Sequence, residues 1–186
     1  MKLKILLTGT CWYELTGLWH LLSTLGYDVF RVPYGNSCIP DCWDLVIVAL
    51  SAEPVSGWGR YLPWIRSLKS QLSGKMMVFV PERLKNINVL QDICPVYSGN
   101  RRPQYIIKFI NAALRYKDYP ATQLQFTDGQ PRVLNRLSGG KGKLSLNSQE
   151  RGLYYHQSRL SKSIGVRNLR LLLITGIERE LSRMIN

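Results

Sequence analysis

Short apolar runs alternate with amphipathic segments over the first 115 residues of the chain. The apolar runs predict strands at 4–8, 29–32, 44–50, 76–80 and 95–97, and apolar positions at helical spacing predict helices over 15–25, 60–72 and 105–114. Segment 44–50 is apolar at every position after Asp44, which is typical of a strand buried on both faces of a parallel sheet. Strands that alternate with helices predict an α/β fold with a parallel sheet over residues 1–115.

Helical patterns alone follow this region. Residues 116–124 lose periodicity and are interpreted as a linker, and residues 125–186 as a small all-α domain. Leu153, Leu160 and Ile164 recur at helical spacing, and Gly165 follows at the position where a left-handed residue commonly ends a helix. A further apolar run begins at Leu169 and continues through Leu181, which predicts a longer last helix packed against the basic one.

Positive charge is concentrated in this second region. The whole chain carries 25 Lys and Arg against 12 Asp and Glu, a net charge of +13, and residues 115–186 hold 13 of the basic and 5 of the acidic side chains. A phosphate-binding module has this character. The charge would also suit an anionic membrane surface or an acidic protein partner. No apolar run reaches the ~20 residues that span a bilayer, so no membrane segment is expected.

Cysteine and histidine usage points away from metal sites and catalysis. Four scattered cysteines do not make a disulfide framework; Cys38 and Cys42 could approach each other, but no further ligand pair completes a zinc site. Cys11 and Cys94 are expected in the core. No nucleophile–base or carboxylate pair emerges, and the start of the chain has no export signal. We expect a reduced, cytoplasmic protein that is not an enzyme and uses no metal or cofactor.

The stretch 152–168 resembles the recognition helix of the LuxR/GerE family of helix-turn-helix transcription factors. The spacing from His156 to Asn168 matches the family, and 165–168 (Gly-Val-Arg-Asn) stands almost unaltered. The resemblance implies binding to double-stranded DNA, with Arg159 as the first choice for a base or phosphate contact. The other DNA-contacting residues it implies are Lys141, Lys143, Arg151, Tyr155, Lys162 and Arg167. A solvated basic helix on a core is the alternative.

The rest of this module departs from the family. Residues 126–134 resemble its opening segment, with Thr127 as a helix N-cap and Gln130 where the family has Glu, so that a neutral hydrogen bond replaces an electrostatic brace or the brace is lost. The family's next short helix gives way to 138–147, which is about four residues shorter and holds three glycines. This basic loop either contacts phosphates or is a solvated turn. The resemblance also implies that the apolar run from Leu169 makes a dimer contact.

Residues 1–115 resemble the receiver domain of two-component response regulators, most closely at 44–58. Ala49 stands at the position of the phospho-accepting Asp, and no carboxylate lies near 8–10, where receivers hold Mg²⁺. Phosphorylation is therefore not expected to switch the protein. Segment 33–43 is short for a crossover helix. Another flavodoxin-like fold is the alternative, and Trp12, Trp58 and Trp64 either pack separately or cover the vacated pocket.

The sequence thus predicts a degenerate receiver-like (flavodoxin-like) domain followed by a helix-turn-helix domain. The expected function is that of a bacterial transcriptional regulator that binds DNA independently of phosphorylation, either as a homodimer or as an auxiliary partner in a heterodimer with another regulator. The alternative is a protein-interaction module that keeps this fold without binding DNA.

Overall fold

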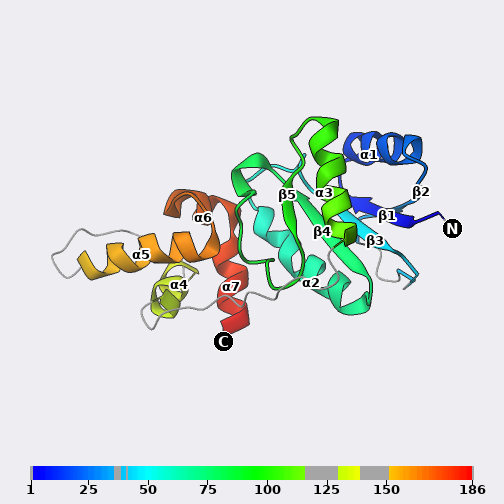
Figure 1. Cartoon of the computed structure of the whole chain (residues 1–186). Coiled ribbons are helices and arrows are strands. Elements are labelled where there is room, and N and C mark those ends of the chain that lie inside the picture. Colours follow the sequence, from blue (N-terminus) through cyan, green and yellow to red (C-terminus); the bar gives the residue numbers. More distant parts are fainter. Residues whose placement is uncertain (1, 36–38, 41, 116–129, 139–150, 186) are drawn as a thin grey trace.

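Five strands of the computed structural model form one parallel sheet, in the order β2-β1-β3-β4-β5. The structure describes residues 2–35, 39–40, 42–115, 130–138 and 151–185. The strands are β1 (Lys4–Gly9), β2 (Asp28–Pro33), β3 (Leu45–Ala49), β4 (Lys75–Val80) and β5 (Val96–Ser98). All neighbouring pairs are parallel, which confirms the sheet that the strand–helix alternation predicts (Figure 1).

Helices cover the two faces of this sheet. Helices α1 (Trp12–Thr24) and α3 (Pro103–Arg115) pack on one face, where Ile5 and Ile47 point. Helix α2 (Leu62–Gln71), preceded by the 3₁₀ turn η1 (Trp58–Tyr61), packs on the other face, where Leu6 and Val46 point. All residues of β3 are buried, so the uniformly apolar segment is a central strand, as predicted.

Two of the four connections between the parallel strands lack a long helix in the described residues. Between β2 and β3, the described positions of 34–44 contain no helix, in agreement with the short crossover expected there. Between β4 and β5 the chain forms only the 3₁₀ turn η2 (Glu82–Leu84) and further turns. Leu84, Ile87 and Leu90 of this connection are completely buried and fill the core in place of a helix.

The C-terminal region is helical, and its last apolar run differs from the prediction. It contains α4 (Gln130–Ser138), α5 (Arg151–Ile164), α6 (Leu169–Thr175) and α7 (Ile177–Ile185). The run from Leu169 is two helices, because Gly176 between them has a left-handed backbone with φ of 71°. Left-handed backbone ends a helix, and glycine adopts it without steric cost.

The dimer contact expected from this run stays a prediction, because Leu173 and Ile174 of α6 are 40% and 43% exposed while the described apolar side chains of α7 are buried. Ile177 and Leu181 of α7 are buried, and they belong to the apolar cluster that includes α2 and one face of the sheet. Figure 1 shows α7 on the side of the helical region that faces α2. This apolar face is therefore used within the chain and is not available to a second copy.

The helical bundle (α4–α7) is docked on the α/β domain through backbone contacts. The Gly57 N–H donates to the Ile174 carbonyl at 2.8 Å, and the Asn88 N–H donates to the Ile164 carbonyl at 2.8 Å. A side chain at Gly59 would come within 3.0 Å of the backbone between α6 and α7. Because one apolar cluster runs through both parts, the bundle and the α/β domain share a core.

Gly165 allows a direct test of this docking. Its φ is 81°, and a Cβ there would overlap the carbonyl of Asn86 in the β4–β5 connection, whereas a Cβ at Gly176 would meet nothing. Gly176→Ala should cost about 1–2 kcal/mol of unfolding free energy from backbone strain alone. Gly165→Ala should cost about 1–3 kcal/mol more, because the two parts must move apart. Chemical denaturation measures both; equal losses would contradict this account of the docking.

Candidate nucleic-acid interface

Helix α5 exposes one polar face and buries the opposite one. Tyr155 is 55% exposed, and Arg159 and Lys162 are also exposed, at the i, i+4 and i+7 positions of a single face. Leu160 and Ile164 are completely buried on the other side. The amphipathic helix predicted from the sequence is therefore confirmed for its described side chains, and we call Tyr155, Arg159 and Lys162 the α5 face.

Tyr155 orients Arg159 on this face. The Arg159 Nη1 donates a hydrogen bond to the Tyr155 hydroxyl at 3.0 Å, and the guanidinium carbon lies 5.4 Å from the ring centroid. Hydrogen bonding and the cation–π contact both restrict a long side chain that would otherwise be mobile. A planar guanidinium held in this way has its remaining N–H donors available for a bidentate acceptor such as phosphate or the edge of guanine.

Contacts with α4 fix the position of α5. Gln130 at the start of α4 is buried, and its Nε2 donates to the Ser163 hydroxyl at 3.2 Å. The sequence left two outcomes open for Gln130 at the family's Glu position: loss of the electrostatic brace, or its replacement by a neutral hydrogen bond. The structure shows the neutral hydrogen bond. Val133 and Leu134 of α4 share the apolar cluster with Leu160 of α5. The α5 face is therefore presented by a packed pair of helices.

Each residue of the Gly-Val-Arg-Asn segment has a distinct structural role. Gly165 ends α5 with its left-handed backbone, and Val166 is buried beside it. Arg167 is exposed. The Asn168 side chain accepts a hydrogen bond from the Leu171 N–H at 2.8 Å and so caps α6. The segment therefore sets the turn between α5 and α6 and leaves one cation at its surface.

Several predicted residues lie outside the part of the chain that the structure describes. These are Thr127, Lys141, Lys143 and the glycine-rich stretch from 139. Arg151 begins α5, but its side chain is not described. The structure brings together Tyr155, Arg159 and Lys162, with Arg167 at the following turn.

The predicted vacated phosphorylation position lies at the carboxyl edge of the sheet. Ala49 is the last residue of β3 and is completely buried, so this position carries no nucleophile. Its neighbour in the adjacent strand is Gly9, where a Cβ would overlap the Ala49 carbonyl oxygen. The backbones of β1 and β3 therefore approach closely at this point.

The expectation of no carboxylate at this edge was wrong, because Glu14 reaches it from the first turn of α1. One Glu14 oxygen accepts from the Ser51 hydroxyl at 2.5 Å and the Ser51 N–H at 3.2 Å, and the other accepts from the Ala52 N–H at 3.1 Å. A Cβ at Gly99, after β5, would overlap the Ser51 side chain. The sequence signal was weak, since a Glu at the start of a helix is common for reasons of helix dipole alone.

A second carboxylate near this edge, Glu53, also has both oxygens hydrogen-bonded to neighbouring side chains. It accepts hydrogen bonds from the hydroxyls of Thr10 and Tyr61, each at 2.5 Å, and lies 3.3 Å from a guanidinium nitrogen of Arg60. Burial by itself would raise the pKa of this carboxyl, but the hydrogen bonds and the positive charge of Arg60 together hold it below its usual value.

These residues do not fit a magnesium site of the receiver type. The oxygens of Glu14 and Glu53 accept from N–H and O–H donors, and Arg60 places a positive charge beside Glu53. Within the described ranges, no three His, Cys, Asp or Glu side chains gather closely enough to ligate a metal. Hydrogen bonds thus fasten the start of α1 to the loop after β3. We call the contacts of Glu14 with Ser51 and Ala52 the Glu14 lock.

The three tryptophans pack in two places. Trp58 is completely buried, and Trp64 packs edge-on against Tyr34 with 4.6 Å between ring centroids. Trp12 is 62% exposed, and the Arg31 guanidinium lies 4.5 Å from its ring centroid. Trp58 and Trp64 are thus linked through the rings of Tyr61 and Tyr34, whereas Trp12 packs against Arg31, so the ring contacts do not join the three in one cover.

The described cysteines are free thiols. Cys94 is buried as predicted, and burial raises its pKa to about 12, so it remains a thiol at neutral pH. Cys11 is only partly buried at the start of α1, in contrast to the expected core position. Cys42 is exposed, and Cys38 lies outside the described residues.

Replacement of Glu14 tests the lock. Glu14→Gln should lower the free energy of unfolding by about 1–3 kcal/mol, because an amide NH₂ would face the N–H and O–H donors that the carboxylate satisfies. The matched control is Glu180→Gln, which removes only the i,i+3 ion pair with Arg183 and should cost less than about 0.5 kcal/mol. Thermal and chemical denaturation measure both variants; a loss at Glu14 no larger than at Glu180 would show that the lock contributes little.

Comparison with known proteins indicates the fold. No protein-family model and no curated protein sequence matches the chain. Among solved structures, the two-component response regulator RcsB in complex with DNA is similar over 98% of this chain and 99% of its own, with a TM-score of 0.58 and 13% sequence identity. The response regulator ChrA of a heme-sensing two-component system is 11% identical over 97% of this chain and 98% of its own, with a TM-score of 0.40. The similarity over nearly the whole of both chains shows that this chain has the fold of that response regulator, with a receiver-like sheet domain.

No helix in the described part of the chain combines the length and apolar character that crossing a bilayer requires.

Proposed function

We propose that this chain is a transcriptional regulator that binds double-stranded DNA through α5 and is not switched by phosphorylation. The observation that carries the proposal is the α5 face, on which Tyr155 holds an exposed Arg159 beside an exposed Lys162. Neither cation has a carboxylate partner among the described residues. Unneutralised cations on a rigid helix are suited to a polyanion.

Base recognition and backbone contact fall to different residues in this proposal. Arg159 is assigned the base contact, because its oriented guanidinium can donate two hydrogen bonds to guanine. Lys162 and Arg167 are assigned to phosphates, which position the protein without reading sequence. Lys141, Lys143 and Arg151 remain proposed phosphate contacts from the resemblance alone. The similarity of fold to the RcsB–DNA complex supports the arrangement.

The sheet domain would contribute contacts and no phosphoryl chemistry. Ala49 offers no nucleophile, and the hydrogen bonds of Glu14 and Glu53 hold the surrounding loop in one arrangement. Control then comes from the amount of protein, from homodimer formation or from pairing with another regulator. Trp12 and Tyr13, which are 62% and 86% exposed at the start of α1, favour a protein partner on that side. They are also the observation behind the second candidate, an interaction module that does not bind DNA.

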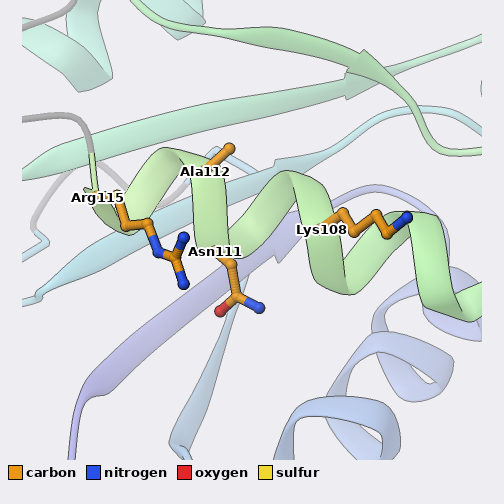
Figure 2. Close-up of a pocket in the computed structure, with 4 residues that line it drawn as sticks. All are labelled: Lys108, Asn111, Ala112 and Arg115. Carbon is orange, nitrogen blue, oxygen red and sulfur yellow. The ribbon is translucent and has the colours of Figure 1, made fainter.

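Arg159→Ala distinguishes these two functions. The protein is first incubated with fragmented bacterial genomic DNA, and the retained fragments are sequenced to obtain a binding motif. On a duplex carrying that motif, Arg159→Ala should weaken binding by about 1–3 kcal/mol and relax the preference at one base position. The matched control is Arg115→Ala on α3 (Figure 2), a helix that packs on the sheet face other than the one that shares its core with the bundle. Recovery of no motif, or equal affinities of the wild type and both variants on the motif duplex, would support the interaction module.

Phosphorylation independence is tested with a small phosphodonor. After incubation with acetyl phosphate and Mg²⁺, the protein should show no added phosphoryl group by intact-mass spectrometry, because Ala49 cannot form an acyl phosphate. Its affinity for the motif duplex should also be unchanged. A phosphoryl adduct accompanied by a changed affinity would refute this part of the proposal.

A further inference from the structure

A groove of about 980 Å³ runs along the junction of the two parts of the chain. On one side it is lined by η2 and the residues after it, including Arg83 and Lys85. On the other side it is lined by the end of α5 and by α6, including Lys162, Arg167 and Arg170. The groove therefore exists only because the helical bundle is docked on the α/β domain.

The groove is strongly positive. Its lining contains five cations and one carboxylate, Glu82. Lys85 at 2.7 Å and Arg101 at 2.8 Å already neutralise that carboxylate, and their contacts help to lower its pKa. Among the described residues, no carboxylate pairs with Arg83, Lys162 or the two arginines of the α5–α6 region. Cations gathered in a groove without counter-charges attract an anionic ligand.

The groove is continuous with the α5 face. Lys162 belongs to both, since it lies on the same side of α5 as Tyr155 and Arg159 and also lines the groove. These three residues follow one another at helical spacing, so the line that they define leads into the groove at the last turn of α5. A linear polyanion that continues from the α5 face into the groove would lie beside Arg167, Arg170 and Arg83, which line it.

Fixed backbone contacts hold the two walls of the groove together. The Asn88 N–H donates to the Ile164 carbonyl at 2.8 Å, and the Asn88 side chain donates to the Ser163 carbonyl at 3.1 Å. Gly165 allows the two backbones to approach at this point. The cations of the two domains are thus kept at a set spacing, so less ordering is required when a ligand binds.

We infer that this groove binds the phosphodiester backbone of DNA flanking the segment read by α5, with Arg83 of the sheet domain and Arg170 of the bundle contacting phosphates. The inference rests on the proposed function and extends the DNA-binding surface onto the receiver-like domain. It implies that this domain, which has no phospho-accepting residue at position 49, contributes directly to affinity.

The test uses the full-length chain with Arg83→Ala and Arg170→Ala combined. Affinity for the motif duplex is measured at several salt concentrations, once with long flanks and once with the duplex trimmed to the motif. On the long duplex, loss of two phosphate contacts should reduce the slope of log K against log salt by about 1.8 in magnitude, at about 0.9 per contact, and leave the preferred motif unchanged. On the trimmed duplex the variant should bind like the wild type. Arg115→Ala with Lys108→Ala, both on α3 (Figure 2), is the matched control for the loss of two charges.

The outcomes separate this inference from the proposed function. A salt slope of the Arg83/Arg170 variant equal to that of the wild type, or equal to that of the α3 control, would overturn the groove while leaving recognition by α5 intact. Equal weakening on long and trimmed duplexes would overturn it as well, because the contacts would then lie within the motif. If the wild type selects no motif and Arg159→Ala has no effect, the proposed function fails, and the groove inference fails with it.

Discussion

The backbone contact between α5 and the β4–β5 connection is the constraint on which the rest of the arrangement depends. Asn88 donates hydrogen bonds to the carbonyls of Ser163 and Ile164, so the last turn of α5 is satisfied by the other part of the chain. Gly165 makes this approach possible, since any side chain there would overlap Asn86. Together with the packing of α5 on α4, this contact sets the direction of α5, and with it the α5 face and the walls of the groove.

The docked bundle also covers the sheet face that the β4–β5 connection does not cover with a helix. A parallel sheet requires cover on both faces, and the β4–β5 connection supplies only a 3₁₀ turn and buried loop side chains such as Leu84 and Ile87. The apolar cluster on this face continues into the bundle through Leu160, Ile177 and Leu181. The helical region therefore completes a core that the sheet domain leaves unfinished, which is why α7 is turned inward and does not present its apolar face to a second chain.

The carboxyl edge of the sheet, close to where the bundle docks on η1, is held by hydrogen bonds of two carboxylates. Glu14 and Glu53 accept hydrogen bonds from backbone and hydroxyl donors, where a phosphoryl switch would need a nucleophile and a bound cation. A lock of this kind favours one loop arrangement. A domain with a fixed loop and a completed core is well suited to hold Arg83 in place beside the end of α5.

The sequence by itself determined the local elements and the polar face of α5. The spacing of apolar residues and the positions of glycines were enough to predict β3, α5 and the end of α5 at Gly165, because these features depend on residues close together in the chain. The end of α6 at Gly176 was not predicted, since an isolated glycine within a helical pattern does not by itself indicate a left-handed backbone. Only the tertiary structure decided which partners distant residues would have. Glu14 finds Ser51, Asn88 finds Ile164, and the cations of the groove meet across two domains, all through contacts that no short window of sequence encodes.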